Sequence, residues 1–418
     1  MIRKVEAGLL NGNVFVPASK SDAQRAILAA SLSKGKSKVY NTGTSKDVEA
    51  MLSCAEVVGA EVVVSSDFIE IEGVSSFPKK GSFDCGESGL AFRLIAALCL
   101  VNNGIYELNG QGTLLERNHD FIDVFGKEYG IRIESSKGKL PYTIYGGLNA
   151  KSIRLDGKET SQFLSGMLMA LPLVGNEVCI EALNVTSTPY LHMTVNTLKA
   201  FGVDVYFDEK SLFTIPAGSK YRPTEYYIEG DWSAASYWIV AAALGHDVTI
   251  KGLSQTSMQA DKMILQLLDS IGVIYSFESG ALLLEKSMLT SFNFDATDCP
   301  DLFPALVSLA AFSHGTSRIS GVHRLLNKES NRAESLKKEF EKMGAEIHIE
   351  GNALVVHGKS LHSSEVRSHG DHRIAMCLAI AGLNVEGGIA IAHSGAVAKS
   401  YPSFWHDFEK LHTKKMGH

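Results

Sequence analysis

The sequence lacks the features that mark several common classes of protein. It has only six cysteines in 418 residues, and no two of them have the spacing of a zinc or redox motif. No apolar run is long enough to cross a membrane, and the first residues lack the apolar stretch of a signal peptide. With 40 basic and 46 acidic residues the net charge is −6, which gives no general attraction to nucleic acid or membranes. These absences predict a reduced, cytoplasmic protein that binds neither nucleic acid nor membrane and holds no metal.

Familiar nucleotide-binding and hydrolase motifs are missing as well. We find no P-loop, no glycine-rich dinucleotide motif after a strand and no Gly-x-Ser-x-Gly. The composition, 45% hydrophobic and 21% charged, is that of an ordinary globular protein, and the length predicts two or three domains. Any specific function must therefore come from a pattern that is distributed along the chain.

Such a pattern is present as a unit that repeats about every 70 residues. Five times, an amphipathic helix ends at a glycine that is followed by a short strand-like run: at Gly59, Gly130, Gly202, Gly272 and Gly344. Glycine suits the position after a helix, where other side chains are strained. A sixth, truncated copy lies at residues 404–411. A second kind of helix, small and apolar, precedes each copy, so we predict six units with one buried and one amphipathic helix each.

Six units divide most simply into two domains of three units. The polar stretch at residues 220–225 follows the third unit, and an N-terminal strand at residues 5–16 is left to complete the second domain. This arrangement requires two chain crossings, near residues 18–19 and 229–230, which is typical of a hinge. The predicted domains are a discontinuous one, residues 1–18 with 230–418, and a continuous one, residues 19–229.

Polar and charged residues gather where the predicted helices begin. In the stretch 19–25, Ser21 or Asp22 is suited to cap a helix, and Lys20 and Arg25 add positive charge. Comparable groups stand at the other helix starts: Glu87, Ser88 and Arg93; Arg117; Thr160, Ser161 and Gln162; Ser187 and Tyr190; Asp231; Asp301; Lys328, Glu329 and Arg332; Asp371, His372 and Arg373; Lys399. If these ends point the same way, they line a cleft for a substrate with several negative groups.

Each of these groups also has a purely structural interpretation. Asp231, Asp301 and Asp371 are suitable helix caps, and residues 187–189 form a common helix start with proline. Residues 328–332 permit pairing of side chains three positions apart on a helix surface. The functional interpretation therefore rests on the recurrence of the pattern, and no single residue carries it.

Seven motifs follow one another in a fixed order over nearly the whole chain. They are Ser19-Lys20-Ser21 with Arg25, Thr160-Ser161-Gln162, the run from Glu229 to Tyr237, Pro300-Asp301, the run from Lys328 to Arg332, Asp371-His372-Arg373, and Ala398-Lys399-Ser400. In these motifs the chain resembles the enolpyruvyl transferase family, and within it the members that use shikimate 3-phosphate. The resemblance implies a two-domain α/β fold, an inside-out α/β barrel with six βαβαββ units, three per domain.

The resemblance also implies a reaction. The enolpyruvyl group of phosphoenolpyruvate is transferred to the 5-hydroxyl of shikimate 3-phosphate, and phosphate is eliminated from a tetrahedral intermediate, in the shikimate pathway to aromatic amino acids. This chemistry requires a base for the hydroxyl proton, an acid for the methylene carbon, and cations for the phosphates and carboxylates. We therefore expect a transferase that acts on these two small molecules as a monomer, without metal or organic cofactor.

Roles are carried over from the family position by position. Asp301 and Glu329 would transfer protons, with Lys20 and Lys328 as further catalytic residues. Shikimate 3-phosphate would be bound, on the side of residues 19–229, by Lys20, Ser21, Arg25, Thr160, Ser161, Gln162, Ser187 and Tyr190, together with Asp301, Arg324 and Lys328. Phosphoenolpyruvate would be bound by Lys20, Gly89, Arg117, Gln162, Arg332, His372, Arg373 and Lys399.

The sequence departs from the family pattern at two places. The usual Asn-Ala-Gly-Thr-Ala-x-Arg-Pro, which borders the phosphate of phosphoenolpyruvate, is replaced by residues 87–94, Glu-Ser-Gly-Leu-Ala-Phe-Arg-Leu. The carboxylate of Glu87 would weaken anion binding unless a nearby cation pairs with it, and we predict reduced sensitivity to glyphosate. Arg324 stands where the family usually has an asparagine that contacts a ring hydroxyl.

Two alternative functions are open at this stage. The first is an enolpyruvyl transferase that acts on UDP-N-acetylglucosamine, but residues 110–116 lack the cysteine of that relative and residues 160–162 favour shikimate 3-phosphate. The second is a non-catalytic anion-binding protein on the same fold. The presence of Asp301 and Glu329 argues against it, because a protein that only binds anions does not need carboxylates facing them.

Overall fold

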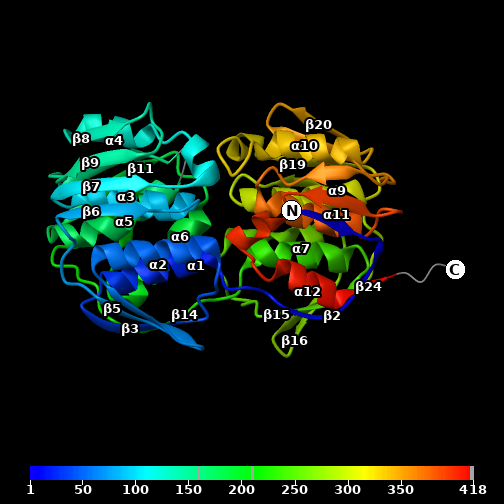
Figure 1. Cartoon of the computed structure of the whole chain (residues 1–418), viewed down its shortest axis with the longest axis horizontal. Helices are drawn as coiled ribbons and strands as arrows, with labels where there is room; N and C mark the ends of the chain where they lie inside the picture. The colour runs from blue at the N-terminus through cyan, green and yellow to red at the C-terminus, as the bar shows by residue number, and fades with distance from the viewer. Residues whose placement is uncertain (158–160, 209–210, 415–418) are drawn as a thin grey trace. The chain divides into compact units, whose positions relative to one another are not determined.

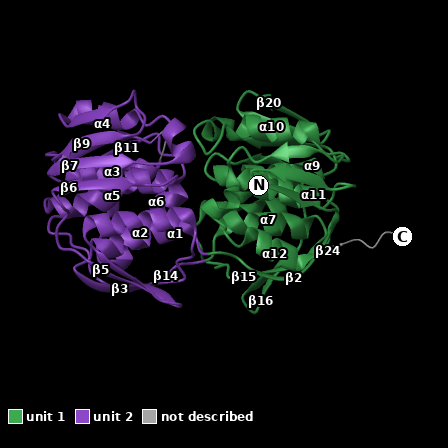
Figure 2. Cartoon of the chain, in the orientation of Figure 1, with its two compact units in different colours: residues 1–17, 230–418 green, residues 18–229 purple. Residues whose placement is uncertain are grey.

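The chain divides into two compact units (Figures 1 and 2). The structure is a computed structural model that describes residues 1–157, 161–208 and 211–414. Unit 1 comprises Met1–Pro17 and Gly230–His418, and unit 2 comprises Ala18–Glu229. The chain thus enters unit 2 one residue before the predicted crossing at 18–19, and it returns between residues 229 and 230.

Unit 2 consists of three βαβαββ repeats. The first contains α1 (Lys20–Ser31), β3 (Gly35–Tyr40), α2 (Lys46–Val58), β4 (Glu61–Val64) and β5 (Phe68–Gly73). The second contains β6 (Lys80–Asp84), α3 (Gly89–Val101), β7 (Gly104–Asn109), η1 (Gly112–Glu116), α4 (Phe121–Tyr129), β8 (Arg132–Ser135) and β9 (Tyr142–Gly146). The third contains β10 (Ser152–Asp156), α5 (Ser161–Ala170), η2 (Leu171–Val174), β11 (Val178–Leu183), α6 (Thr188–Ala200), β12 (Tyr206–Phe207) and β13 (Leu212–Ile215). The opening strand of the first repeat, β14 (Glu225–Tyr227), comes from the end of the unit and pairs in parallel with β3.

Unit 1 repeats the pattern with strands taken from the N-terminal segment. The fourth repeat contains β2 (Gly8–Phe15), α7 (Trp232–Ala243), β15 (Asp247–Lys251), η3 (Ala260–Met263), α8 (Ile264–Ser270), β16 (Tyr275–Glu278) and β17 (Ala281–Leu284). The fifth contains β18 (Asn293–Asp295), η4 (Pro300–Leu302), α9 (Phe303–Ala311), β19 (Thr316–Ser320), η5 (Val322–Leu325), α10 (Arg332–Lys342), β20 (Glu346–Glu350) and β21 (Ala353–His357). The sixth contains β22 (Glu365–Arg367), α11 (His372–Gly382), β23 (Ile389–Ala392), η6 (Ser394–Lys399), α12 (Phe404–Leu411) and β24 (His412–Lys414), and β1 (Ile2–Val5) completes its sheet.

The N-terminal segment forms two strands: β2 is the strand predicted at residues 5–16, and β1 is a further strand that sequence reasoning missed. β1 pairs antiparallel with β23, whereas β2 pairs in parallel with β15 of a different sheet. The short connection between them, residues 6–7, lets the chain pass from one sheet to the next. Both strands lie in unit 1, as expected for a segment that completes the second set of repeats.

The described strands form six sheets, three in each unit. Their strand orders are β14-β3-β5-β4, β6-β7-β9-β8 and β10-β11-β13-β12 in unit 2, and β16-β17-β15-β2-β24, β18-β19-β21-β20 and β1-β23-β22 in unit 1. The five glycines predicted to follow the amphipathic helices all have positive φ, between 68° and 103°. The predicted architecture of repeated βαβαββ units is therefore present, three in each unit.

One helix of each repeat forms the interior of its unit. All residues of α3, α7 and α11 are buried. In unit 1, α7, α9 and α11 pack against one another, and in unit 2, α3 packs along α5 (Figure 1). These helices are rich in alanine and leucine, so they pack closely and hold their polar first residues in fixed positions.

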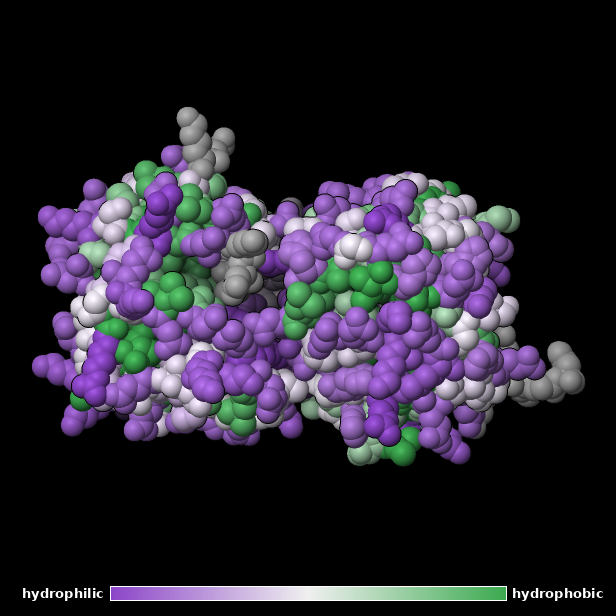
Figure 3. Space-filling view, turned by 90° about the horizontal axis from the view of Figure 1, so that it is seen from above, coloured by the Kyte–Doolittle hydropathy of each residue, from purple (hydrophilic) through white to green (hydrophobic). Residues whose placement is uncertain are grey.

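The outer surface is mostly polar. On the face seen in Figure 3, hydrophilic residues cover most of each unit, and hydrophobic residues form small, separate areas. None of the helices in the described ranges combines the length and the hydrophobicity that a membrane span requires.

Gly166 on α5 allows that helix to approach α3. A Cβ atom added at Gly166 would lie 2.7 Å from the backbone oxygen of Arg93 and 2.9 Å from the Cβ of Ala97. Non-bonded carbon atoms normally stay about 3.5–4.0 Å apart. The contact between the two helices thus depends on the absence of a side chain, and it fixes the part of α3 that carries Arg93.

We expect Gly166→Ala to lower the free energy of unfolding by about 1–2 kcal/mol, measured by urea denaturation with circular dichroism. The added methyl group overpacks the helix contact, and this outweighs the gain of about 1 kcal/mol in helix propensity. Gly395→Ala is the control, because no atom lies within 4 Å of its added Cβ. Equal effects of the two substitutions would contradict the interpretation.

Candidate active site

The centre of the candidate site in unit 1 is the carboxylate of Asp301. It lies in η4, directly before α9, and three basic side chains contact it: Arg332 at 2.8 Å, Arg373 at 2.9 Å and Lys328 at 3.4 Å. Burial opposes ionisation, but the charges of Arg373, Lys328 and Arg332 outweigh it and lower the pKa of Asp301 well below its usual value. Asp301 is therefore ionised at neutral pH. The interpretation of Asp301 as a helix cap is wrong, because neither η4 nor α9 has a side-chain cap and Leu302 is the N-cap residue of α9.

The guanidinium of Arg332 joins three carboxylates. Besides Asp301 it contacts Glu329 at 2.7 Å through Nη2 and Asp371 at 2.9 Å through Nε, and its side chain is 0% exposed. Burial alone would lower the pKa of Arg332, but Asp371, Glu329 and Asp301 raise it. The predicted pair of Glu329 and Arg332 is present. Its placement on a helix surface is wrong, because α10 begins at Arg332, so that Glu329 lies before the helix, and Arg332 is buried.

Asp371 connects this cluster to the start of α11. Its carboxylate accepts a hydrogen bond from the backbone N–H of Arg373 at 2.9 Å, so it caps the helix and binds Arg332 at the same time. Asp231 caps α7 in a similar way by accepting from the N–H of Ala234 at 2.8 Å. The structural and functional interpretations of Asp371 are thus compatible.

Three further predicted residues lie close to these elements. His372 is the first residue of α11 and is fully buried. Lys399 is the last residue of η6, is buried, and belongs to an element that packs against α11. Arg324 lies half-buried in η5, where burial lowers its pKa while Asp298 and Asp301 oppose the shift. The positive charge of Arg324 therefore interacts electrostatically with Asp301.

Sequence reasoning missed two residues in the segment before α8. Gln259 donates to the backbone oxygen of Gly230 at 2.7 Å and accepts from the N–H of Trp232 at 3.0 Å. Asp261 is fully buried and accepts a hydrogen bond from the hydroxyl of Ser233. Burial, with a contribution from the charge of Asp301, raises the pKa of Asp261 to about 7. They could have been predicted from the sequence, because Gln259 and Asp261 are polar residues directly before a helix, like the groups at the other helix starts.

In unit 2, α1 begins at Lys20 after Ser19, and the prediction that Ser21 or Asp22 caps it is wrong. The side chain of Asp22 instead lies in the interior, where it accepts a hydrogen bond from the hydroxyl of Tyr226 at 2.9 Å. Burial raises the pKa of Asp22 to about 7, although this hydrogen bond acts in the opposite direction. Lys20 forms an ion pair with Asp47 at 3.0 Å.

Arg25 ties α1 to two other helices of unit 2. It donates to the hydroxyl of Thr194 on α6 at 2.8 Å, to the backbone oxygen of Ser21 at 2.7 Å, and more weakly to the hydroxyl of Ser165 on α5 at 3.4 Å. It also reaches the backbone oxygen of Tyr190 at 3.5 Å. Burial lowers its pKa to about 10, so it remains charged. The structure thus brings together Arg25, Ser21 and Tyr190.

Two other predicted residues begin helices of the same unit. Ser187 precedes α6 with a φ of 54°, and Ser161 is the buried first residue of α5. Thr160 lies outside the described residues, so its predicted role stays a prediction.

A second basic cluster lies at the start of α3. A Cβ added at Gly89 would lie 2.7 Å from an Nη atom of Arg93 and 2.8 Å from one of Arg117, so both guanidinium groups lie against this glycine. Arg93 also donates to the side-chain oxygen of Gln162 at 3.1 Å. Two guanidinium groups at a helix N-terminus form a strongly anion-attracting site. His119 stays neutral beside them, because burial and the charges of Arg93 and Arg117 lower its pKa to about 2.

Glu87 borders this cluster and is held by Thr113 of η1. One carboxylate oxygen accepts from the N–H of Thr113 at 3.2 Å and from its hydroxyl at 3.0 Å. The same hydroxyl accepts from Arg117 at 3.3 Å. The negative charge that distinguishes this chain from the family pattern is therefore linked to the position of Arg117.

We expect Asp22→Asn to stabilise the protein at neutral pH. The folded state keeps a proton on Asp22 up to about pH 7, whereas the unfolded chain releases it near pH 4. Folded wild-type protein thus binds more protons than the unfolded chain, and its free energy of unfolding falls as the pH rises through this window. The variant cannot titrate, so its advantage should grow by about 2–3 kcal/mol between pH 5 and 8.

Urea denaturation at four pH values measures this difference. Asp67→Asn, on an exposed carboxylate of unit 2, is the control and should give a difference that does not vary with pH. A constant difference for Asp22→Asn would show that the carboxyl is not protonated in the folded state.

Comparison with known proteins first defines a class. The fold matches an EPSP synthase from Acinetobacter baumannii with a TM-score of 0.79, at 24% identity over 99% of this chain and 98% of that one. It also matches the enolpyruvyl transferase NikO from Streptomyces tendae with a TM-score of 0.76, at 18% identity over 99% of both chains. The predicted enolpyruvyl transferase fold is thereby confirmed.

The family follows from the sequence. The model of the EPSP synthase family, 3-phosphoshikimate 1-carboxyvinyltransferase, matches residues 5–408. Proteins of the latter name from Clostridium kluyveri and Clostridium novyi are 36% and 34% identical, over 96% and 98% of this chain and 95% and 97% of their own lengths. The chain belongs to the EPSP synthase family, which confirms the resemblance seen in the motifs and makes it a transferase.

Among the described residues, no group of three or more His, Cys, Asp or Glu side chains is placed to hold a metal ion.

Proposed function

We propose that this chain transfers the enolpyruvyl group of phosphoenolpyruvate to the 5-hydroxyl of shikimate 3-phosphate and releases phosphate. The observation that carries the proposal is the contact of one ionised carboxylate, Asp301, with three cations beside a second carboxylate, Glu329. A reaction that moves two protons between highly anionic substrates needs both kinds of group. The names of the relatives support the same reaction.

Asp301 is a weak base as long as Arg332, Arg373 and Lys328 hold its charge. The phosphate and carboxylate groups of the substrates would compete for these cations. When a cation turns toward a substrate, the pKa of Asp301 rises, and the carboxylate becomes able to take the hydroxyl proton. In this proposal substrate binding itself activates the base, and Glu329 is the second proton-transfer group.

Unit 2 supplies the remaining cations in this proposal. Arg93 and Arg117, at Gly89, suit the phosphate of phosphoenolpyruvate, while Arg25 with Ser21 and Tyr190 suits shikimate 3-phosphate. Lys20 is paired with Asp47. In the proposal it turns from Asp47 to the substrates, in the same way as Lys328, Arg332 and Arg373 turn from Asp301. A cytoplasmic monomer without nucleic-acid or membrane partners completes the proposal, and its six free thiols suit a reducing compartment.

Phosphate release with phosphoenolpyruvate and either shikimate 3-phosphate or UDP-N-acetylglucosamine tests the reaction. We expect release with shikimate 3-phosphate alone, and a loss of about 10²–10⁴-fold in kcat for Asp301→Asn because the base is removed. Asp295→Asn, on an exposed carboxylate six residues earlier, should retain activity. Release with the sugar nucleotide alone would favour the alternative transferase, and release with neither from folded protein would favour the anion-binding protein.

The effect of Glu87 on inhibition is a separate prediction. Glyphosate is an anion, and the carboxylate of Glu87 repels anions at the cluster of Arg93 and Arg117, so we expect weak inhibition of the wild-type enzyme. Glu87→Gln should lower the inhibition constant at least about tenfold, since removing one unit charge within about 10 Å of the bound anion, at an effective dielectric of about 20, changes the binding free energy by more than about 1.4 kcal/mol.

Glu116→Gln is the matched control, because it removes the same charge from an exposed position in η1, the element whose Thr113 binds Glu87. Inhibition of the wild type at low micromolar glyphosate would contradict the prediction. So would equal inhibition constants of the two variants.

A further inference from the structure

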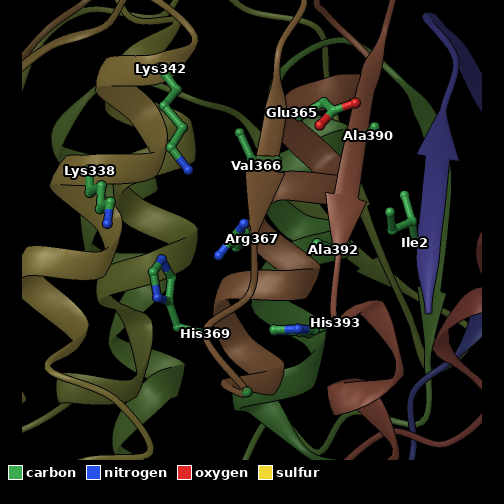
Figure 4. A pocket seen from close by; sticks show the side chains of 11 residues that line it. Ile2, Lys338, Lys342, Glu365, Val366, Arg367, His369, Ala390, Ala392 and His393 are labelled. Carbon is green, nitrogen blue, oxygen red and sulfur yellow. The ribbon is translucent and has the colours of Figure 1, made fainter.

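Unit 1 contains a cavity of about 700 Å³ that is separate from the candidate active site. Helix α10 forms one wall, and the outward face of the sheet β1-β23-β22 forms the other (Figure 4). The residues that line it include none of those that contact Asp301. Its volume lies in the range of about 300–1,000 Å³ that is typical of small-molecule sites.

Basic side chains dominate one side of this cavity. Lys342 extends from α10 toward Arg367 on β22, as Figure 4 shows, and Lys338, His369 and His393 also line the cavity. No described side chain forms an ion pair or hydrogen bond with Lys338, with the guanidinium of Arg367 or with the imidazole of His393. Two cations and a histidine thus face a common space without a partner.

The buried carboxylate of Glu339 fixes this arrangement from behind. It binds Lys342 at 2.6 Å, His369 at 2.7 Å and the backbone N–H of Arg367 at 2.9 Å, and its side chain is 0% exposed. Although burial acts in the opposite direction, these hydrogen bonds lower the pKa of Glu339 to about 2, so it is ionised and joins α10 to β22. The basic wall is therefore held in place before any ligand binds.

The other side of the cavity is apolar. Ala390 and Ala392 on β23 and Ile2 on β1 line it, and Ile2 is 68% exposed. The small side chains of the two alanines leave room above the sheet. All three side chains are uncharged, so they suit contact with an apolar group. Glu365 is the one carboxylate of the lining. Because Glu339 pairs with Lys342, the charges that remain for the cavity are those of Lys338 and Arg367, and these two outnumber Glu365.

We propose that this cavity binds a small organic oxyanion, that is, a phosphate or carboxylate group on an apolar body. Arg367, Lys338 and His393 would hold the oxyanion, because guanidinium, ammonium and imidazole groups are the usual donors to phosphate and carboxylate. The apolar body would lie on Ala390, Ala392 and Ile2. This site does not depend on the proposed reaction, because it shares no residue with the Asp301 cluster.

Isothermal titration of the full chain with phenyl phosphate tests the site, with benzoate in a second arm to separate phosphate from carboxylate recognition. We expect binding of at least one probe to the wild type. The double variant Lys338→Gln/Arg367→Gln should weaken that binding about tenfold or more, as each lost charged contact typically does. Circular dichroism checks that the variant is folded, which we expect because neither side chain has a described partner.

The matched control is Lys337→Gln/Arg318→Gln. It removes the same charge from the same unit, and its two residues pair with Glu341 and Glu350 outside the cavity. It should bind the probe like the wild type. Ala390→Phe fills the apolar side without a change in charge, and it should weaken phenyl phosphate more than inorganic phosphate.

Two outcomes would overturn the proposal. The first is no binding of either probe to the wild type. The second is equal binding by the wild type, the control and both cavity variants, which would place the probe elsewhere, for example at the anion sites of the proposed reaction.

Discussion

The buried guanidinium of Arg332 is the interaction on which unit 1 depends. It joins Asp301 before α9, Glu329 before α10 and Asp371 at the start of α11, and it does so with no exposure of its own side chain. A buried charge without partners would be strongly destabilising. The three carboxylates are therefore needed for the fold as well as for chemistry, because they compensate a charge that the interior could not otherwise hold.

The charges of this cluster balance. Arg332, Arg373 and Lys328 carry three positive charges, and Asp301, Glu329 and Asp371 carry three negative ones. Such a cluster leaves no net charge of its own in the interior, and an anionic substrate would compete with its carboxylates for the same cations. The stability of the folded site and its response to substrates are thus two results of one set of ion pairs, with donors already oriented.

The repeated fold explains why such groups gather where they do. Every repeat contains a buried helix, and the free backbone N–H groups of its first turn need hydrogen-bond acceptors. The residues at these helix starts differ from one repeat to the next. Ser88 and Asp231 cap their helices. Asp371 caps its helix and also binds Arg332. Asp301 forms ion pairs and does not cap a helix. In unit 2, Arg93 and Arg117 gather at the start of α3 instead.

The sequence by itself determined the repeats, the buried helices, the glycines that end the amphipathic helices and the order of the family motifs. These are properties of single elements. A buried helix shows in the sequence as a run of apolar residues, and a positive φ after a helix shows as a glycine that recurs in each repeat. The tertiary structure decided the partners. That Asp22 accepts from Tyr226, that Thr113 links Glu87 to Arg117, and that Asp301 binds a guanidinium 72 residues away follow from how separate elements pack. Local periodicity shows that a side chain is buried, but only the packing of distant segments determines which charge it meets there.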